Sequence, residues 1–174
     1  MMAYKQYTKE AVELLKKLIS TPSVSRDEKA AADLLQQQIK VWGLPCKRIG
    51  NNLVVAKRLS KRKPTLLLNA HIDTVKPVAT WSRDPFTPVV EDGKLYGLGA
   101  NDCGGGLVSL LQVFRILTEE KDVPYNLIYV ASCEEEVSGQ NGFSAVLPTL
   151  PPIDVAIVGE PTGMQPAIAE KGLM

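Results

Sequence analysis

Three short apolar runs, separated by longer segments, constrain the fold more than any other feature of the sequence. They are TLLLNA (65–70), NLIYVAS (126–132) and DVAIV (154–158). Each has the length of a buried strand, and a leucine-rich helical pattern over 104–118 lies between the first two. Strands that alternate with helical segments predict an α/β domain with parallel pairing, in which ligands bind beyond the carboxyl ends of the strands.

Two amphipathic helices are predicted before these strands. Residues 8–20 place their apolar side chains on one face, and Thr8 is a suitable N-cap. Ser25 and Glu28 have the spacing of a capping box, so we expect a second helix to begin there and to end at Gly43. Both helices have the pattern of surface helices that pack on a core.

The segments between these elements differ in character. Residues 44–59 are predicted to be extended, with a turn at Asn51-Asn52. A long insertion over 75–102, rich in proline and aromatic residues, follows the first core strand. Loops of this length beside strand ends usually serve a site, so we expect the insertion to do the same.

Charge and cysteine content exclude several classes of protein. The 174 residues carry 20 basic and 19 acidic side chains, so the charge gives no argument for nucleic acid or an acidic membrane as partner. Three cysteines without a C-x-x-C pair indicate a reducing, cytoplasmic compartment rather than a disulfide framework. The apolar runs are far shorter than the roughly 20 residues of a membrane helix. We therefore expect one cytoplasmic globular domain.

Acidic side chains and the only histidine follow the predicted strands. His71 and Asp73 follow the first strand, three consecutive acids, Glu134–Glu136, follow the second, and Glu160 follows the third. Asp102 precedes a glycine-rich helix start. Taken singly, each has an ordinary explanation: a structural histidine, a helix cap, a solvated loop or a strand end. Together, so many carboxylates in one cleft require cations, and one imidazole with several carboxylates predicts a two-metal hydrolytic site.

Five ordered motifs point to a known family. They are HIDTV (71–75), WSRDPF (81–86), DGKLYGLGANDCGGG (92–106), SCEEEVSGQNG (132–142) and VGEPT (158–162). In this respect the chain resembles the M20 family of zinc-dependent peptidases and deacylases, over roughly residues 8 to 173. The resemblance implies a three-layer αβα catalytic domain with a mostly parallel mixed sheet.

The resemblance also implies a set of metal ligands. His71, Asp102, Glu136 and Glu160 match these ligands, with Asp102 shared between two divalent ions and the two glutamates on different ions. Zn²⁺ is the expected ion, and Co²⁺ and Mn²⁺ are alternatives. In the family the peptide bond after the shared aspartate is cis, so a cis bond is predicted between Asp102 and Cys103.

The catalytic roles fall on two further acids. Glu135 matches the general base that takes a proton from the attacking water, and Asp73 matches the residue that holds the imidazole. Neighbouring glutamates in an extended segment face opposite ways, which would let one bind metal while the other meets the water. Glu134 replaces a common aspartate, and Cys103-Gly104 replaces an apolar-Lys pair, which leaves loop geometry and redox sensitivity open.

Substrate and assembly are implied by the same resemblance. The motifs are most similar to acetylornithine deacetylases of arginine biosynthesis, whereas desuccinylases tend to carry arginine where this chain has Leu98. An N-acyl amino acid is thus the expected substrate, and a homodimer the expected full-length assembly. Because the sequence ends inside a predicted strand (166–174), we expect residues 1–174 to be the N-terminal portion of the catalytic domain. Such a fragment would lack the lid or dimerisation domain and a second histidine ligand, bind metal weakly and be nearly inactive.

Other functions remain open at this point. A desuccinylase or dipeptidase of the same family would use the same site, and a non-catalytic metal-binding or interaction relative would keep only part of it. Cys103 with His71 could form a cysteine hydrolase, although the thiol has no orienting partner in the sequence. Gly97-x-Gly99 weakly resembles a dinucleotide-binding turn, but the third glycine is misplaced.

Overall fold

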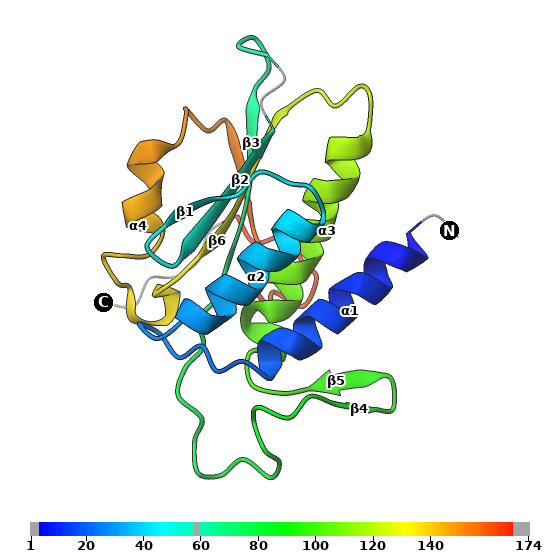
Figure 1. The fold of residues 1–174 in the computed structure, drawn as a ribbon, viewed down its shortest axis with the longest axis vertical. Coiled ribbons are helices and arrows are strands. Elements are labelled where there is room, and N and C mark those ends of the chain that lie inside the picture. The colour runs from blue at the N-terminus through cyan, green and yellow to red at the C-terminus, as the bar shows by residue number, and fades with distance from the viewer. Residues whose placement is uncertain (1–3, 58–59, 169–174) are drawn as a thin grey trace.

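The three apolar runs form adjacent strands of one sheet. The computed structural model describes residues 4–57 and 60–168, and its main sheet has five strands in the order β1-β2-β6-β3-β7 (Figure 1). Their bounds are β1 (Lys47–Ile49), β2 (Asn52–Lys57), β3 (Thr65–His71), β6 (Asn126–Ser132) and β7 (Val155–Val158). Strand β3 pairs in parallel with both β6 and β7, as predicted, whereas β2 pairs antiparallel with β6 and β1. The result is a mixed α/β sheet whose parallel part carries the acidic strand ends.

Helices cover both faces of this sheet. The helices are α1 (Lys5–Ile19), α2 (Lys29–Val41), α3 (Gly106–Glu119) and α4 (Phe143–Val146). Side chains of α1, α2 and α3 share one core with alternate residues of β2, β3 and β6, and Val146 of α4 packs with the intervening residues on the opposite face. Because side chains alternate along a strand, the central strand β6 is buried over its whole length. The expected α/β architecture with helices on both sides is confirmed.

The predicted helix starts need correction. Helix α1 begins at Lys5, and the hydroxyl of Thr8 donates to the Tyr4 carbonyl inside the first turn instead of capping the helix. Helix α2 begins at Lys29, so the capping box predicted from Ser25 and Glu28 is wrong. The Ser25 hydroxyl instead points to the end of β3, a tertiary partner that no local spacing indicates.

The long insertion contains a hairpin. Strands β4 (Val89–Glu91) and β5 (Lys94–Tyr96) pair around an Asp92-Gly93 turn in which both residues have positive φ. The hairpin and the preceding loop lie beyond the carboxyl end of β3, beside the start of α3 (Figure 1). Of the predicted last strand, residues 166–168 are not extended into a sheet, and 169–174 lie outside the described residues.

Among the described residues, no helix combines the length and the apolar character that a bilayer span requires.

Candidate metal centre

His71 lies at the centre of the predicted site. It is the last residue of β3, with a ring that is 1% exposed. On one side, Nδ1 lies 2.8 Å from the Asp73 carbonyl oxygen and 3.5 Å from the carboxylate Oδ1 of the same residue. On the other side, Nε2 lies 3.1 Å from Asp102 Oδ1, 3.8 Å from Glu160 Oε1 and 3.9 Å from Glu135 Oε2. The parallel strands therefore bring side chains distant in sequence to one imidazole nitrogen.

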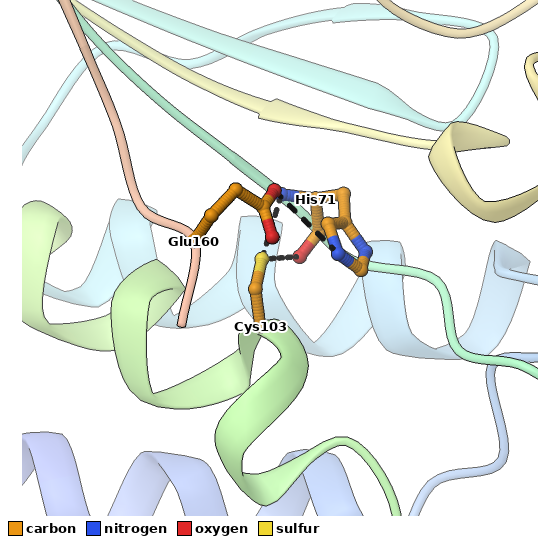
Figure 2. A group of neighbouring side chains, drawn as sticks. All are labelled: His71, Cys103 and Glu160. Atoms are coloured by element: carbon orange, nitrogen blue, oxygen red, sulfur yellow. Dashed lines mark hydrogen bonds and ion pairs between the residues drawn. The ribbon is translucent and has the colours of Figure 1, made fainter. Parts of the chain in front are cut away.

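The donor set fits divalent metal ions. Two groups each offer three ligand atoms within 4.8 Å of one another: His71 with Asp102 and Glu136, and His71 with Cys103 and Glu160. Figure 2 shows the second group, in which the Glu160 carboxylate faces the His71 ring and the Cys103 thiol lies against the His71 main chain. An imidazole with several carboxylates suits Zn²⁺ and Mn²⁺. The predicted ligands thus share one cluster.

Electrostatics in the cluster favour a cation. Burial alone would lower the pKa of His71, but hydrogen bonds with Asp73 and Cys103 raise it to about 12. Burial, together with neighbouring carboxylates such as Asp102, raises the pKa of both Glu136 and Glu160. Burial and neighbouring negative charge both disfavour the ionised carboxylates, and a bound metal ion would offset both effects.

The Asp73 carboxylate organises the acidic loop after β6. Its Oδ1 accepts the Glu135 N–H at 3.1 Å, and its Oδ2 accepts the Glu136 N–H at 3.2 Å and the Ser25 hydroxyl at 2.7 Å. Burial raises the pKa of Asp73, but hydrogen bonds from His71, Ser25 and the two amides outweigh it and keep the pKa below its usual value. Asp73 therefore contacts His71, as predicted, and also the main chain of two candidate site residues.

The three consecutive glutamates were expected to be extended, but in the structure they form a turn. Glu134 has a left-handed conformation with φ of 56°, and Glu135–Val137 form a single 3₁₀ turn. The buried Glu134 carboxylate accepts hydrogen bonds from the main-chain and side-chain amides of Asn141, at 3.3 and 2.9 Å. Glu134 thus closes its own loop, while Glu135 and Glu136 carry their carboxylates to the cluster.

The segment after Asp102 contains the predicted cis peptide bond. The bond joins Asp102 to Cys103, and the Cys103 thiol accepts the His71 N–H at 3.1 Å and donates to the His71 carbonyl at 3.3 Å. A Cβ at Gly104 would lie 2.5 Å from the Gly99 carbonyl oxygen and 2.6 Å from Leu15 Cδ1. The Cys-Gly departure therefore suits this backbone, which leaves no room for a side chain at position 104.

Two residues near the site escaped the sequence-based prediction. Ser25 contacts Asp73, and the fully buried carboxylate of Glu28 accepts the main-chain amides of Arg26 and Glu134. Their S-x-x-E spacing was the available signal, but it is the same spacing that a capping box has.

Comparison with known proteins identifies the family. Residues 67–171, more than half of the chain, match the model of peptidase family M20/M25/M40. The chain belongs to this family of hydrolytic metallopeptidases. An acetylornithine deacetylase of Shigella sonnei (strain Ss046) is 34% identical over 177 residues, which cover 92% of this chain and 45% of the relative. The chain therefore spans less than half the length of that relative.

Solved structures share the fold. An M20 family metallo-carboxypeptidase, Sso-CP2 from Sulfolobus solfataricus, has a TM-score of 0.72 at 22% identity, over 86% of this chain and 37% of that one. The YXEP protein of Bacillus subtilis, a dinuclear metal binding peptidase from the M20 family, has a TM-score of 0.67 at 15% identity. The latter match covers 88% of this chain and 43% of that one. At these identities the likeness concerns the fold.

Proposed function

We propose that this chain carries the metal and base residues of an amide hydrolase that removes the acyl group from an N-acyl amino acid. The observation that carries the proposal is the convergence of four acids on the His71 ring, at the carboxyl ends of parallel strands, in a member of the M20 family. Since the chain spans 45% of its curated relative, the activity is proposed for the full gene product.

The metal ligands in this proposal are His71, Asp102, Glu136 and Glu160. Their ligand atoms lie in the two overlapping groups around His71, and Asp102 is assigned to both ions. Two bound divalent ions, Zn²⁺ in the first place, would polarise the substrate carbonyl and lower the pKa of water. Co²⁺ and Mn²⁺ have similar ligand requirements and are alternative ions.

Glu135 is the proposed general base. Its side chain is 54% exposed, and its carboxylate lies 3.9 Å from His71 Nε2, so it borders the ligand cluster and is accessible to a substrate. It takes a proton from the attacking water and passes it to the departing amine. Asp73 holds the Glu135 main chain and the imidazole in place and is assigned a positioning role.

Acetylornithine is the proposed substrate, and the 34% identity to an acetylornithine deacetylase supports it. A peptide is the second candidate, because the fold is shared with a metallo-carboxypeptidase. The other expectations from the sequence stay predictions: a homodimer, a cytoplasmic location, and residues 1–174 as part of a catalytic domain that takes a further histidine from elsewhere.

Replacement of the base tests the proposal. In the full gene product, Glu135→Gln should lower turnover of N-acetyl-L-ornithine by about 10²- to 10⁴-fold while the metal content stays unchanged, because Gln cannot carry the proton. The hairpin variant Glu91→Gln is the control and should keep full activity. Equal activity of Glu135→Gln and wild type would contradict the role. If a dipeptide or N-succinyl-diaminopimelate were turned over faster than N-acetyl-L-ornithine, the substrate assignment would be wrong. Metal binding without turnover of any of these compounds would indicate a non-catalytic relative.

A further inference from the structure

Three consecutive main-chain amides of the acidic loop donate to buried carboxylates. The Glu134 N–H donates to Glu28 Oε1 at 3.2 Å, and the amides of Glu135 and Glu136 donate to the two oxygens of Asp73. Glu28 is fully buried, and Asp73 is 1% exposed. Charge-assisted hydrogen bonds of this kind are stronger than neutral ones, and burial shields them from water. The loop therefore takes its main-chain position from two carboxylates outside it.

Both carboxylates depend on one turn that precedes α2. Glu28 belongs to this turn, and its second oxygen accepts the Asn51 side-chain amide at 3.1 Å. Ser25 opens the turn, and its hydroxyl donates to Asp73 Oδ2 at 2.7 Å. The turn is joined to the segment after β3, because the Ser25 N–H donates to the Thr74 carbonyl at 3.1 Å. Residues 25–28 thus contact the acidic loop on one side and the His71 strand on the other.

We propose that Ser25 and Glu28 are positioning residues for the site. Ser25 acts through Asp73, and Glu28 contacts the loop directly. Together they position the main chain of Glu134–Glu136, which carries the proposed base and one proposed ligand. The inference rests on the proposed function, to which it adds two residues that do not themselves join the ligand cluster. Removal of a residue that hydrogen-bonds to a metal ligand typically weakens metal binding by about 10- to 100-fold.

Two serines of the same segment provide a matched test. Ser25→Ala in the full gene product should change the chemical shifts of the Glu135 and Glu136 amide protons in NMR spectra and weaken Zn²⁺ binding about 10-fold by calorimetry. Ser23→Ala is the control, since the Ser23 hydroxyl is also buried but donates to the Ile72 carbonyl at 3.1 Å rather than to Asp73. It should leave both measurements unchanged. If Ser25→Ala behaves like Ser23→Ala, the inference is wrong.

Glu28→Gln is the second variant, and it keeps the side-chain volume. It should shift the Glu134 amide and weaken Zn²⁺ binding, with smaller changes at the next two amides. Shifted amides with zinc affinity equal to that of wild type would reduce the turn to a structural role and overturn the inference. A wild-type protein without measurable zinc binding would contradict the proposed function instead, and the amide shifts alone would then decide whether the turn positions the loop.

Discussion

The Cys103 thiol contacts the main chain of His71 instead of solvent. It is 1% exposed, and burial raises its pKa, so little thiolate is present near neutral pH. Cys133 is also buried, and burial together with the charges of Glu28 and Glu134 raises its pKa to about 12. The redox sensitivity that the sequence left open at Cys103 is therefore disfavoured by its surroundings.

Thiol reactivity tests this description of the cysteines. In the folded protein at pH 8, a disulfide reagent such as Ellman's should modify only Cys46 among the chain's three thiols, because Cys46 is half-buried and the other two are buried. Cys103 and Cys133 should react only after unfolding in guanidinium chloride. A Cys46→Ser variant should then show no fast phase, and equal rates for all three thiols in the native protein would contradict the burial.

The site residues illustrate what single-residue patterns can predict. The proximity of His71, Asp102 and Glu160 could be predicted because each follows a strand or precedes a glycine-rich helix, and parallel strands end at one edge. Ser25 and Glu28 were misassigned, because a hydroxyl and a carboxylate three residues apart satisfy a helix end and a distant loop equally well. Which hydrogen-bond partner the Ser25 and Glu28 side chains adopt depends on tertiary distances that the local sequence does not determine.

At the scale of elements, α3 and β7 approach each other at two glycines. A Cβ on Gly106, the first residue of α3, would lie 2.2 Å from the Gly159 carbonyl oxygen and 2.8 Å from its carbonyl carbon. The contact joins the helix start after Asp102 to the strand end before Glu160. The close approach of two main chains therefore fixes the distance between two proposed ligands.

Alanine substitution tests this contact. Gly106→Ala should destabilise the fold by about 1–3 kcal/mol, because one of two main chains must move to relieve the overlap. Gly105→Ala is the control: its Cβ would meet only the Ala100 carbonyl oxygen, at 3.1 Å, and its φ of −60° suits alanine. Urea unfolding measures both variants, and equal stabilities would contradict the described packing.

Elements were predictable to different degrees. The apolar runs of β3, β6 and β7 predicted parallel strands, because buried strands alternating with helices have few other arrangements. The neighbouring glutamates were expected to lie in an extended segment, whereas Glu135–Val137 form a 3₁₀ turn. The Glu135 and Glu136 amides of this turn donate to the carboxylate of Asp73, which follows β3 far earlier in the sequence, so these hydrogen bonds are invisible in the local pattern.

At the scale of the whole molecule, the site exists only when the sheet is complete. Its proposed ligands come from the ends of β3 and β7, the turn before α3 and the loop after β6, and no two of these segments are adjacent in the sequence. The parallel pairing of β3 with β6 and β7 brings the carboxylates that follow these strands to one edge of the sheet. The repulsion among the carboxylates destabilises the folded protein, and a bound metal ion would reduce this repulsion.

Anomalous diffraction at the zinc absorption edge tests the central claim most directly. Crystals of the protein grown with Zn²⁺ should show an anomalous peak about 2.0–2.2 Å from His71 Nε2 and from carboxylate oxygens of Asp102 and Glu160. A second peak should lie between Asp102 and Glu136. Zinc peaks confined to other parts of the protein, with none among these four side chains, would contradict the metal centre and with it the proposed hydrolase.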